Sequence, residues 1–164
     1  MLAVFFAHSR FVNFSVAFQA PSLTARALRL LSTREHSRAE LERKLQQFEE
    51  EPGALARVLD ALAAKDFIND DRVVGSVLYR RAGKLGAVRI KQELQAKGLA
   101  PERVTEAVAN LRASELDRAR EVWRKKFGTQ ALDASERAKQ MRFLAGRGFG
   151  GDTIRRVVSG TDDE

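Results

Sequence analysis

Cysteine is absent from this sequence of 164 residues, and histidine occurs only as His8 and His36. A chain without cysteine forms neither a disulfide framework nor a thiolate metal site, and two histidines are too few for a histidine-based metal cluster. No run of about 18 apolar residues is present, so we expect no membrane span and no membrane partner. These absences are compatible with a reducing compartment, and we expect a cytoplasmic protein.

Residue patterns typical of enzymes are also missing. No glycine-rich loop ends in lysine followed by serine or threonine, and no His-x-x-His pair occurs. The glycines within 83–86 and 146–151 fall at expected helix ends, where a structural role is sufficient. Asp70 and Asp71 are explained better by helix capping than by metal binding. We therefore expect no catalytic residue, no cofactor and no metal.

Positive charge is in excess, with 29 lysines and arginines against 22 acidic residues and a net charge of +7. An excess of this size favours a polyanion or an acidic protein surface as partner, and it does not bear on the fold.

A repeated helical pattern organises the chain. Apolar residues recur at helical spacing over 87–94, Gly98 ends that helix, and Pro101 stands in the first turn of a second helix over 101–111. The pattern returns further on, where Gly148 is flanked, like Gly98, by a basic and an apolar residue. A less regular copy of the same helical pattern lies earlier in the chain than these two.

These copies predict an all-α fold of three tandem three-helix repeats that form an elongated, curved body, because units of this size stack on their neighbours to bury both faces. We place the repeats at 22–65, 66–112 and 113–160. Residues 1–21 are expected to be a poorly ordered extension, in which 14–18 could pair as a short strand, and 161–164 an acidic tail.

Helix starts are marked by capping residues. Ser37 with Glu40, and Asp133 with Glu136, have the spacing of capping boxes, in which each side chain bonds the backbone N–H of the other residue. Asn69 or Asp70 is expected to cap the fourth helix.

Basic residues form three clusters. In the first, over 72–97, Glu93 is the only acidic residue after Arg72; the second lies over 118–126 and the third over 142–156. Such runs are often solvated helix faces, but the near-absence of balancing acids and the concave shape expected of a stacked array make a binding role an equal alternative. The candidate contact residues are Arg80, Arg81, Lys84, Arg89, Lys91 and Lys97, with Arg147, Arg155 and Arg156 as a secondary group.

Two features that suggest nucleic-acid readout have simpler explanations. Trp123 lies among the cations of the second cluster, yet its helical spacing from other apolar residues is typical of a core position. The turn at Gly98 resembles a helix-turn-helix, but the second helix offers only Arg103 for reading bases, and Glu102 and Glu106 would face phosphate. Sequence-specific DNA binding is therefore not expected.

Taken in order, five segments resemble the RecX family of bacterial regulatory proteins over about 25–158. Each segment by itself is a common helix-cap or helix-turn pattern, whereas the occurrence of all five in one order is fairly specific for the family. At position 73 the sequence has valine where the family often has an aromatic residue. The segments are REHSRAELERKL (34–45), KDFINDDR (65–72), RIKQELQAKGL (89–99), ARxxWRKKFG (119–128) and RFLAGRGF (142–149) with its following IRRVV.

The resemblance implies a non-enzymatic regulator that binds RecA filaments on single-stranded DNA. We expect the protein to be a monomer. Such a protein would restrain the ATPase, strand exchange and co-protease activity of RecA, and so act in the SOS response and in DNA repair and recombination. Weak binding to single- or double-stranded DNA would be compatible with this role. The alternative is a helical module that binds nucleic acid without sequence preference. An enzyme that uses a carboxylate pair has no spaced residues to support it.

Overall fold

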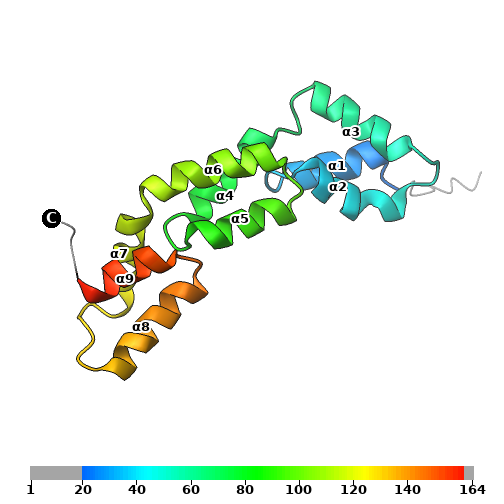
Figure 1. The fold of residues 1–164 in the computed structure, drawn as a ribbon. Coiled ribbons are helices and arrows are strands. Elements are labelled where there is room, and N and C mark those ends of the chain that lie inside the picture. Colours follow the sequence, from blue (N-terminus) through cyan, green and yellow to red (C-terminus); the bar gives the residue numbers. More distant parts are fainter. Residues whose placement is uncertain (1–19, 161–164) are drawn as a thin grey trace, which may run out of the picture.

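The computed structural model describes residues 20–160, and all regular structure in this range is helical (Figure 1). The expected extension and strand before residue 20, and the acidic tail at 161–164, lie outside the described residues. The helices are α1 (Leu23–Leu31), α2 (Arg38–Leu45), the 3₁₀ turn η1 (Gln46–Phe48), α3 (Ala54–Ala64), α4 (Asp70–Arg81), α5 (Ala87–Ala96), α6 (Pro101–Ala113), α7 (Glu115–Lys126), α8 (Ala134–Gly146) and α9 (Gly151–Ser159).

The helices follow one another in three groups of three, along an elongated body whose axis bends between the groups (Figure 1). We call α1–α3, α4–α6 and α7–α9 repeats 1, 2 and 3. Each repeat closes around its own apolar cluster, centred on Leu41 and Leu59 in repeat 1, on Ile90 and Leu94 in repeat 2 and on Leu144 in repeat 3. The predicted all-α repeat fold is confirmed.

Trp123 packs against the core of repeat 3, as its helical spacing predicted. Its Nε1–H donates to the side-chain oxygen of the buried Gln140 at 2.8 Å, so the polar end of the indole is satisfied inside the repeat. Phe127 meets Phe143 edge to face, with ring centroids 5.2 Å apart. These aromatic rings stabilise the repeat itself.

The predicted caps of α2 and α4 are present. Ser37 accepts from the Glu40 N–H and donates its own backbone N–H to the Glu40 carboxylate, which is a complete capping box. Asn69 caps α4 by accepting from two backbone N–H groups.

The second expected capping box is only half formed. Asp133 accepts from the Glu136 N–H at 2.7 Å, as predicted, but the Glu136 carboxylate accepts from the N–H of Leu132 instead of that of Asp133. The reciprocal bond is shifted by one residue towards the start of the chain.

At both junctions, the turn between the second and third helices of one repeat lies on the preceding repeat. The α5–α6 turn lies on the start of α2, and the α8–α9 turn lies on the start of α5. Gly98 and Gly148, with φ of +72° and +82°, occupy these turns, and a Cβ on either would lie within 2.6 Å of a side chain in the preceding repeat, Ala39 or Arg89. Glycine at these two positions allows both the left-handed backbone and the close approach.

Candidate interaction surface

The junction between repeats 2 and 3 is built from backbone hydrogen bonds. The Gly86 N–H donates to the Arg147 carbonyl at 2.9 Å, and the Val88 N–H donates to the Gly148 carbonyl at 3.1 Å. The turn of repeat 3 therefore satisfies two of the N–H groups that the start of α5 leaves without helical partners. This pairing fixes the positions of the side chains around it.

Three cations from two repeats come together at this junction, and we call Lys84, Arg89 and Arg147 the junction cluster. The Arg89 Nε donates to the Gly146 carbonyl at 3.3 Å, and an Nη of Arg147 lies 3.5 Å from the Lys84 carbonyl. The Arg147 guanidinium stacks on the ring of Phe143, with 4.4 Å between its central carbon and the ring centroid. The repeats thus bring one residue of the predicted secondary group beside two of the predicted main group.

The charges of the junction cluster are not neutralised within residues 20–160. Lys84 and Arg89 are exposed, Arg147 is half-buried, and the hydrogen-bond acceptors of the two arginines are backbone carbonyls rather than carboxylates. Cations held together without acidic partners create a positive potential that attracts anions. The cluster is therefore suited to bind phosphate or carboxylate groups.

Two more predicted contact residues are exposed on repeat 2. Arg80, in the last turn of α4, is exposed and donates its Nε–H to the Ser76 carbonyl at 3.1 Å. Lys91 is exposed on α5. Neither has an acidic partner in the described part of the chain, so both remain available to an anionic partner.

Other predicted contacts are occupied within the protein. Arg81 pairs with Glu93 at 3.2 Å, and Arg155 pairs with Asp152 one turn earlier on α9. Arg156 is half-buried and lines a small hollow beside Trp123. A partner could still displace the exposed pairs, since such pairs contribute only about 0–1 kcal/mol each.

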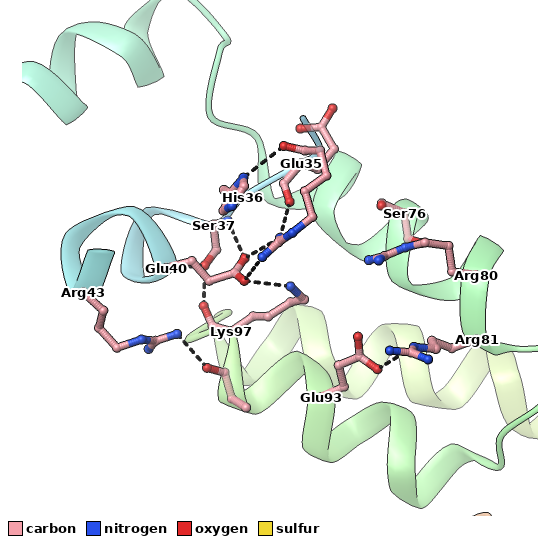
Figure 2. Close-up of polar contacts among 12 residues, drawn as sticks. Glu35, His36, Ser37, Glu40, Arg43, Ser76, Arg80, Arg81, Glu93 and Lys97 are labelled. Carbon is pink, nitrogen blue, oxygen red and sulfur yellow. Dashed lines mark hydrogen bonds and ion pairs between the residues drawn. The ribbon is translucent and has the colours of Figure 1, made fainter. Parts of the chain in front are cut away.

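Lys97 does not lie on the exposed surface, and its expected role as a contact residue requires correction. Only 9% of the residue is exposed, and its Nζ lies 2.9 Å from the Glu40 carboxylate of repeat 1 (Figure 2). Its carbonyl also accepts a hydrogen bond from the Ser37 hydroxyl. Position 97 is the C-cap of α5, where the turn enters the junction, and stacking of the repeats turns this lysine inward.

The junction between repeats 1 and 2 is centred on the Glu40 carboxylate. Burial opposes ionisation of this group, but hydrogen bonds from Arg34, Lys97 and the Ser37 N–H outweigh that effect and lower its pKa to about 2. Arg43 adds a bond to the Ala96 carbonyl at 3.0 Å (Figure 2). Charged side chains thus join repeat 1 to repeat 2, whereas the turn of repeat 3 is paired with the start of α5 through backbone hydrogen bonds.

Arg118, from the second basic cluster, has a structural role. Its guanidinium donates to the carbonyls of Ala82, Leu85 and Leu111 at 2.7–2.9 Å, which joins repeat 2 to α7. Burial lowers its pKa, and the nearby Glu115 partly offsets that effect. Glu115 itself accepts from the Ala87 N–H at 2.9 Å, so it caps α5 from the next repeat.

Cations in repeat 1 were not anticipated from the sequence. Arg26 and Arg29 on α1 and Lys44 on α2 line a hollow between the two helices. Arg26 and Arg29 are three positions apart, a spacing that indicates a shared helix face. Lys44 lies on another helix, and the helical periodicity of α1 cannot predict that it joins the two arginines.

Residues 20–160 contain no group of three or more His, Cys, Asp or Glu side chains placed to hold a metal ion. Within the same range, none of the helices has both the length and the apolar character needed to cross a membrane.

Comparison with known proteins relates the two outer repeats to one family. Residues 25–62 match the family model for the first three-helix domain of RecX, and residues 113–158 match the model for the third. A "Regulatory protein RecX" from Leptothrix cholodnii is 48% identical over 143 residues, which is 87% of this chain and 91% of the relative. The chain belongs to the RecX family.

A second curated RecX protein and a solved RecX structure are also similar to this chain over most of its length. The "Regulatory protein RecX" of Herminiimonas arsenicoxydans is 46% identical over 142 residues, 87% of this chain and 94% of the relative. The crystal structure of RecX from Lactobacillus salivarius superposes with a TM-score of 0.67 at 20% identity, over 84% of this chain and 93% of that one, which supports the fold. The relatives from Leptothrix cholodnii and Herminiimonas arsenicoxydans are named as regulatory proteins. In this chain the junction cluster lies where repeats 2 and 3 meet.

Proposed function

We propose that this protein binds RecA filaments on single-stranded DNA and inhibits or modulates the ATPase, strand exchange and co-protease activity of RecA. It acts without catalysis, in the regulation of DNA repair and recombination. Membership of the RecX family supports RecA as the partner, and the observation that carries the proposal for this chain is the junction cluster, three cations from two repeats without acidic partners among the described residues.

The shape of the body suits an extended partner. The repeats form an elongated, curved array (Figure 1). The junction cluster lies where repeats 2 and 3 meet, and Arg80 and Lys91 lie on α4 and α5 of repeat 2. A nucleoprotein filament offers DNA phosphates and protein carboxylates along a groove. A basic body of this shape can lie in such a groove and contact successive protomers, which obstructs filament growth and access of other proteins.

The proposed main contact combines five of the predicted residues. The paired Arg81, Arg155 and Arg156 form a weaker secondary contact because their existing interactions must be exchanged for new ones. Lys97 contributes indirectly, by holding repeat 1 against repeat 2. The main contact residues are Arg80, Lys84, Arg89, Lys91 and Arg147.

Single-stranded-DNA-dependent ATP hydrolysis by RecA, titrated with this protein while DNA is in excess, tests the proposal. Filament binding that blocks growth should inhibit hydrolysis at well below one molecule per RecA protomer, whereas no effect at any ratio would refute the proposal. The variant Arg80→Glu, Lys84→Glu, Lys91→Glu should inhibit at least tenfold less, because it reverses three exposed charges.

A matched control changes charge outside the proposed contact. Lys65→Glu reverses an exposed lysine at the end of α3, in repeat 1. Inhibition by this variant should match that of the unmodified chain. Equal loss of inhibition in Lys65→Glu and in a Lys84→Glu single variant would show that net charge, and not this surface, determines binding.

The unpaired cations of repeat 2 also favour a second function, binding of nucleic acid without sequence preference. Phosphate contacts release counterions, so affinity for DNA alone would then fall log-linearly with salt. An interface with RecA that includes packed apolar side chains should retain affinity as salt rises. Salt-sensitive DNA binding without an effect on RecA would select this second function.

A further inference from the structure

A hollow of about 410 Å³ lies between α1 and the α2–η1 segment, at the end of the array furthest from the junction cluster. Leu30, Leu45 and Phe48 supply its apolar wall, and Arg26, Arg29 and Lys44 supply its cations. We call it the repeat 1 groove.

Within residues 20–160, no repeat stacks on the groove side of repeat 1. The apolar residue next to the turn glycine of repeats 2 and 3, Leu99 or Phe149, is only 6% or 4% exposed, since the preceding repeat covers that turn. In repeat 1 the connection between the second and third helices is residues 46–53, and Phe48 there is 38% exposed. Among the described residues, a surface that stacking covers in repeats 2 and 3 is therefore uncovered in repeat 1.

All charged residues that line the groove are basic. None of its lining residues is acidic, and Arg29 and Lys44 are exposed and have no side-chain partner in residues 20–160. Arg26 is held in place, because its guanidinium stacks on Phe48 with 3.9 Å between its central carbon and the ring centroid, and its Nε–H donates to the Pro21 carbonyl at 2.9 Å. The groove therefore combines an ordered apolar wall with two unpaired cations.

Acidic residues lie on the other side of the Arg26–Phe48 stack. Glu49, Glu50 and Glu51 line a neighbouring hollow that shares Arg26 and Phe48 with the repeat 1 groove. An acidic ligand is repelled from that side and attracted to the side with Arg29 and Lys44. The charge pattern thus gives a bound ligand one preferred orientation.

We propose that the repeat 1 groove binds an acidic peptide segment of a partner protein that carries an aromatic or other bulky apolar side chain. The apolar side chain packs against Leu30 and Phe48, while neighbouring carboxylates contact Arg29 and Lys44. This binding site goes beyond the proposed function and is separate from the junction cluster.

The chain's own termini fit the groove less well. Residues 1–19 contain apolar and aromatic side chains but no aspartate or glutamate, so they offer no carboxylate to Arg29 and Lys44. The last three residues, Asp162, Asp163 and Glu164, are acidic but bring no apolar side chain. The two required properties occur together in neither segment.

Fluorescence anisotropy with the full chain and a labelled peptide of four aspartates followed by a C-terminal phenylalanine tests the proposal. We expect saturable binding that weakens at least tenfold when the phenylalanine is replaced by alanine, or when the aspartates are replaced by asparagines. The variant Arg29→Glu, Lys44→Glu should lose binding to a similar extent, and Phe48→Ala should weaken it severalfold. Lys84→Glu, in the junction cluster, should bind as the unmodified chain does.

Four outcomes would overturn the proposal. The first is that the peptide does not bind saturably, and the second is that the asparagine peptide binds as well as the aspartate peptide. The third is that an oligothymidylate displaces the labelled peptide equally well and depends on Arg29 and Lys44 in the same way. The fourth is that the unmodified chain sediments as a dimer and the Arg29→Glu, Lys44→Glu variant does not. The last two would identify phosphate, or the tail of a second copy, as the occupant.

Discussion

The Nζ of Lys97 lies 2.9 Å from Oε1 of Glu40, across the junction between repeats 1 and 2, and the two side chains are only 11% and 10% exposed. Removing two charges from water is costly, and the other hydrogen bonds that the carboxylate accepts help to offset this cost. Arg34 and the Ser37 N–H supply further bonds to the carboxylate. Loss of either partner should therefore be costly.

Replacement of the carboxylate should destabilise the protein more than replacement of the lysine. Glu40→Gln leaves Lys97 buried without a counter-charge and should cost about 2–4 kcal/mol. Lys97→Met leaves Glu40 bonded to Arg34 and Ser37 and should cost about 1–2 kcal/mol. Urea unfolding measures both. Glu42→Gln, in the exposed pair with Arg38, is the control and should cost less than about 0.5 kcal/mol.

Acid should destabilise the protein through Glu40. Its folded pKa of about 2 lies below the ordinary value of 4.5, so the unfolded state binds more protons between these values. The stabilisation is complete above pH 4.5 and is lost as the pH falls towards 2. Unfolding free energies measured over this range should fall less steeply in Glu40→Gln than in the unmodified chain. Equal slopes would contradict the lowered pKa.

His36 should add a separate loss of stability at milder acidity. The residue is 1% exposed, its Nδ1 lies 3.0 Å from the Arg34 carbonyl, and its Nε2 has no hydrogen-bond partner in the described part of the chain. Burial lowers its pKa from the ordinary 6.5, against the opposing effect of the bond to Arg34. The unfolded state therefore binds more protons below pH 6.5, and stability is lost as the pH falls below that value. His36→Gln should remove this loss, which thermal unfolding at pH 7 and pH 5.5 can show.

Gly86→Ala should separate repeats 2 and 3. The φ of Gly86 is −78°, which alanine adopts readily, but a Cβ there would lie 2.2 Å from the Gly148 carbonyl oxygen. Because backbone and not a movable side chain is in the way, the two repeats must shift apart, at a cost of about 1–3 kcal/mol.

Gly75→Ala is the matched control for this substitution. Gly75 lies inside α4, and a Cβ there would have nothing within 4 Å. Alanine should stabilise that helix by about 0.5–1 kcal/mol, because it restricts the unfolded chain and favours helical backbone. Chemical unfolding of the two variants should give opposite signs, and destabilisation of both would contradict the junction geometry.

Salt should reveal the phosphate contacts of the junction cluster. If Lys84 contacts a DNA phosphate, Lys84→Glu should reduce the slope of log affinity for single-stranded DNA against log salt by at least about 0.7. Lys65→Glu should leave the slope unchanged. Equal slopes in all three proteins would exclude Lys84 from phosphate contact.

Apolar periodicity and capping residues predicted the helices of this protein and its three repeats. The caps of α2 at Ser37 and of α4 at Asn69 depend on bonds between residues two or three positions apart, so local sequence determines them. The repetition of the turn glycines at 98 and 148 was also predicted, because each is flanked in the sequence by a basic and an apolar residue. Their contact with the preceding repeat was not predicted, because it joins residues far apart in the chain.

The candidate surface shows the limit of the sequence most directly. The excess of basic residues over 72–97 predicted the same role for Lys84 and Lys97. In the structure Lys97 is buried against Glu40, whereas Lys84 is exposed beside Arg147. Nothing local distinguishes the two, since both follow the end of a helix. The sequence by itself determined the helices, their repetition and the net charge, whereas only the stacking of the repeats decided which cations are neutralised at a junction and which face solvent.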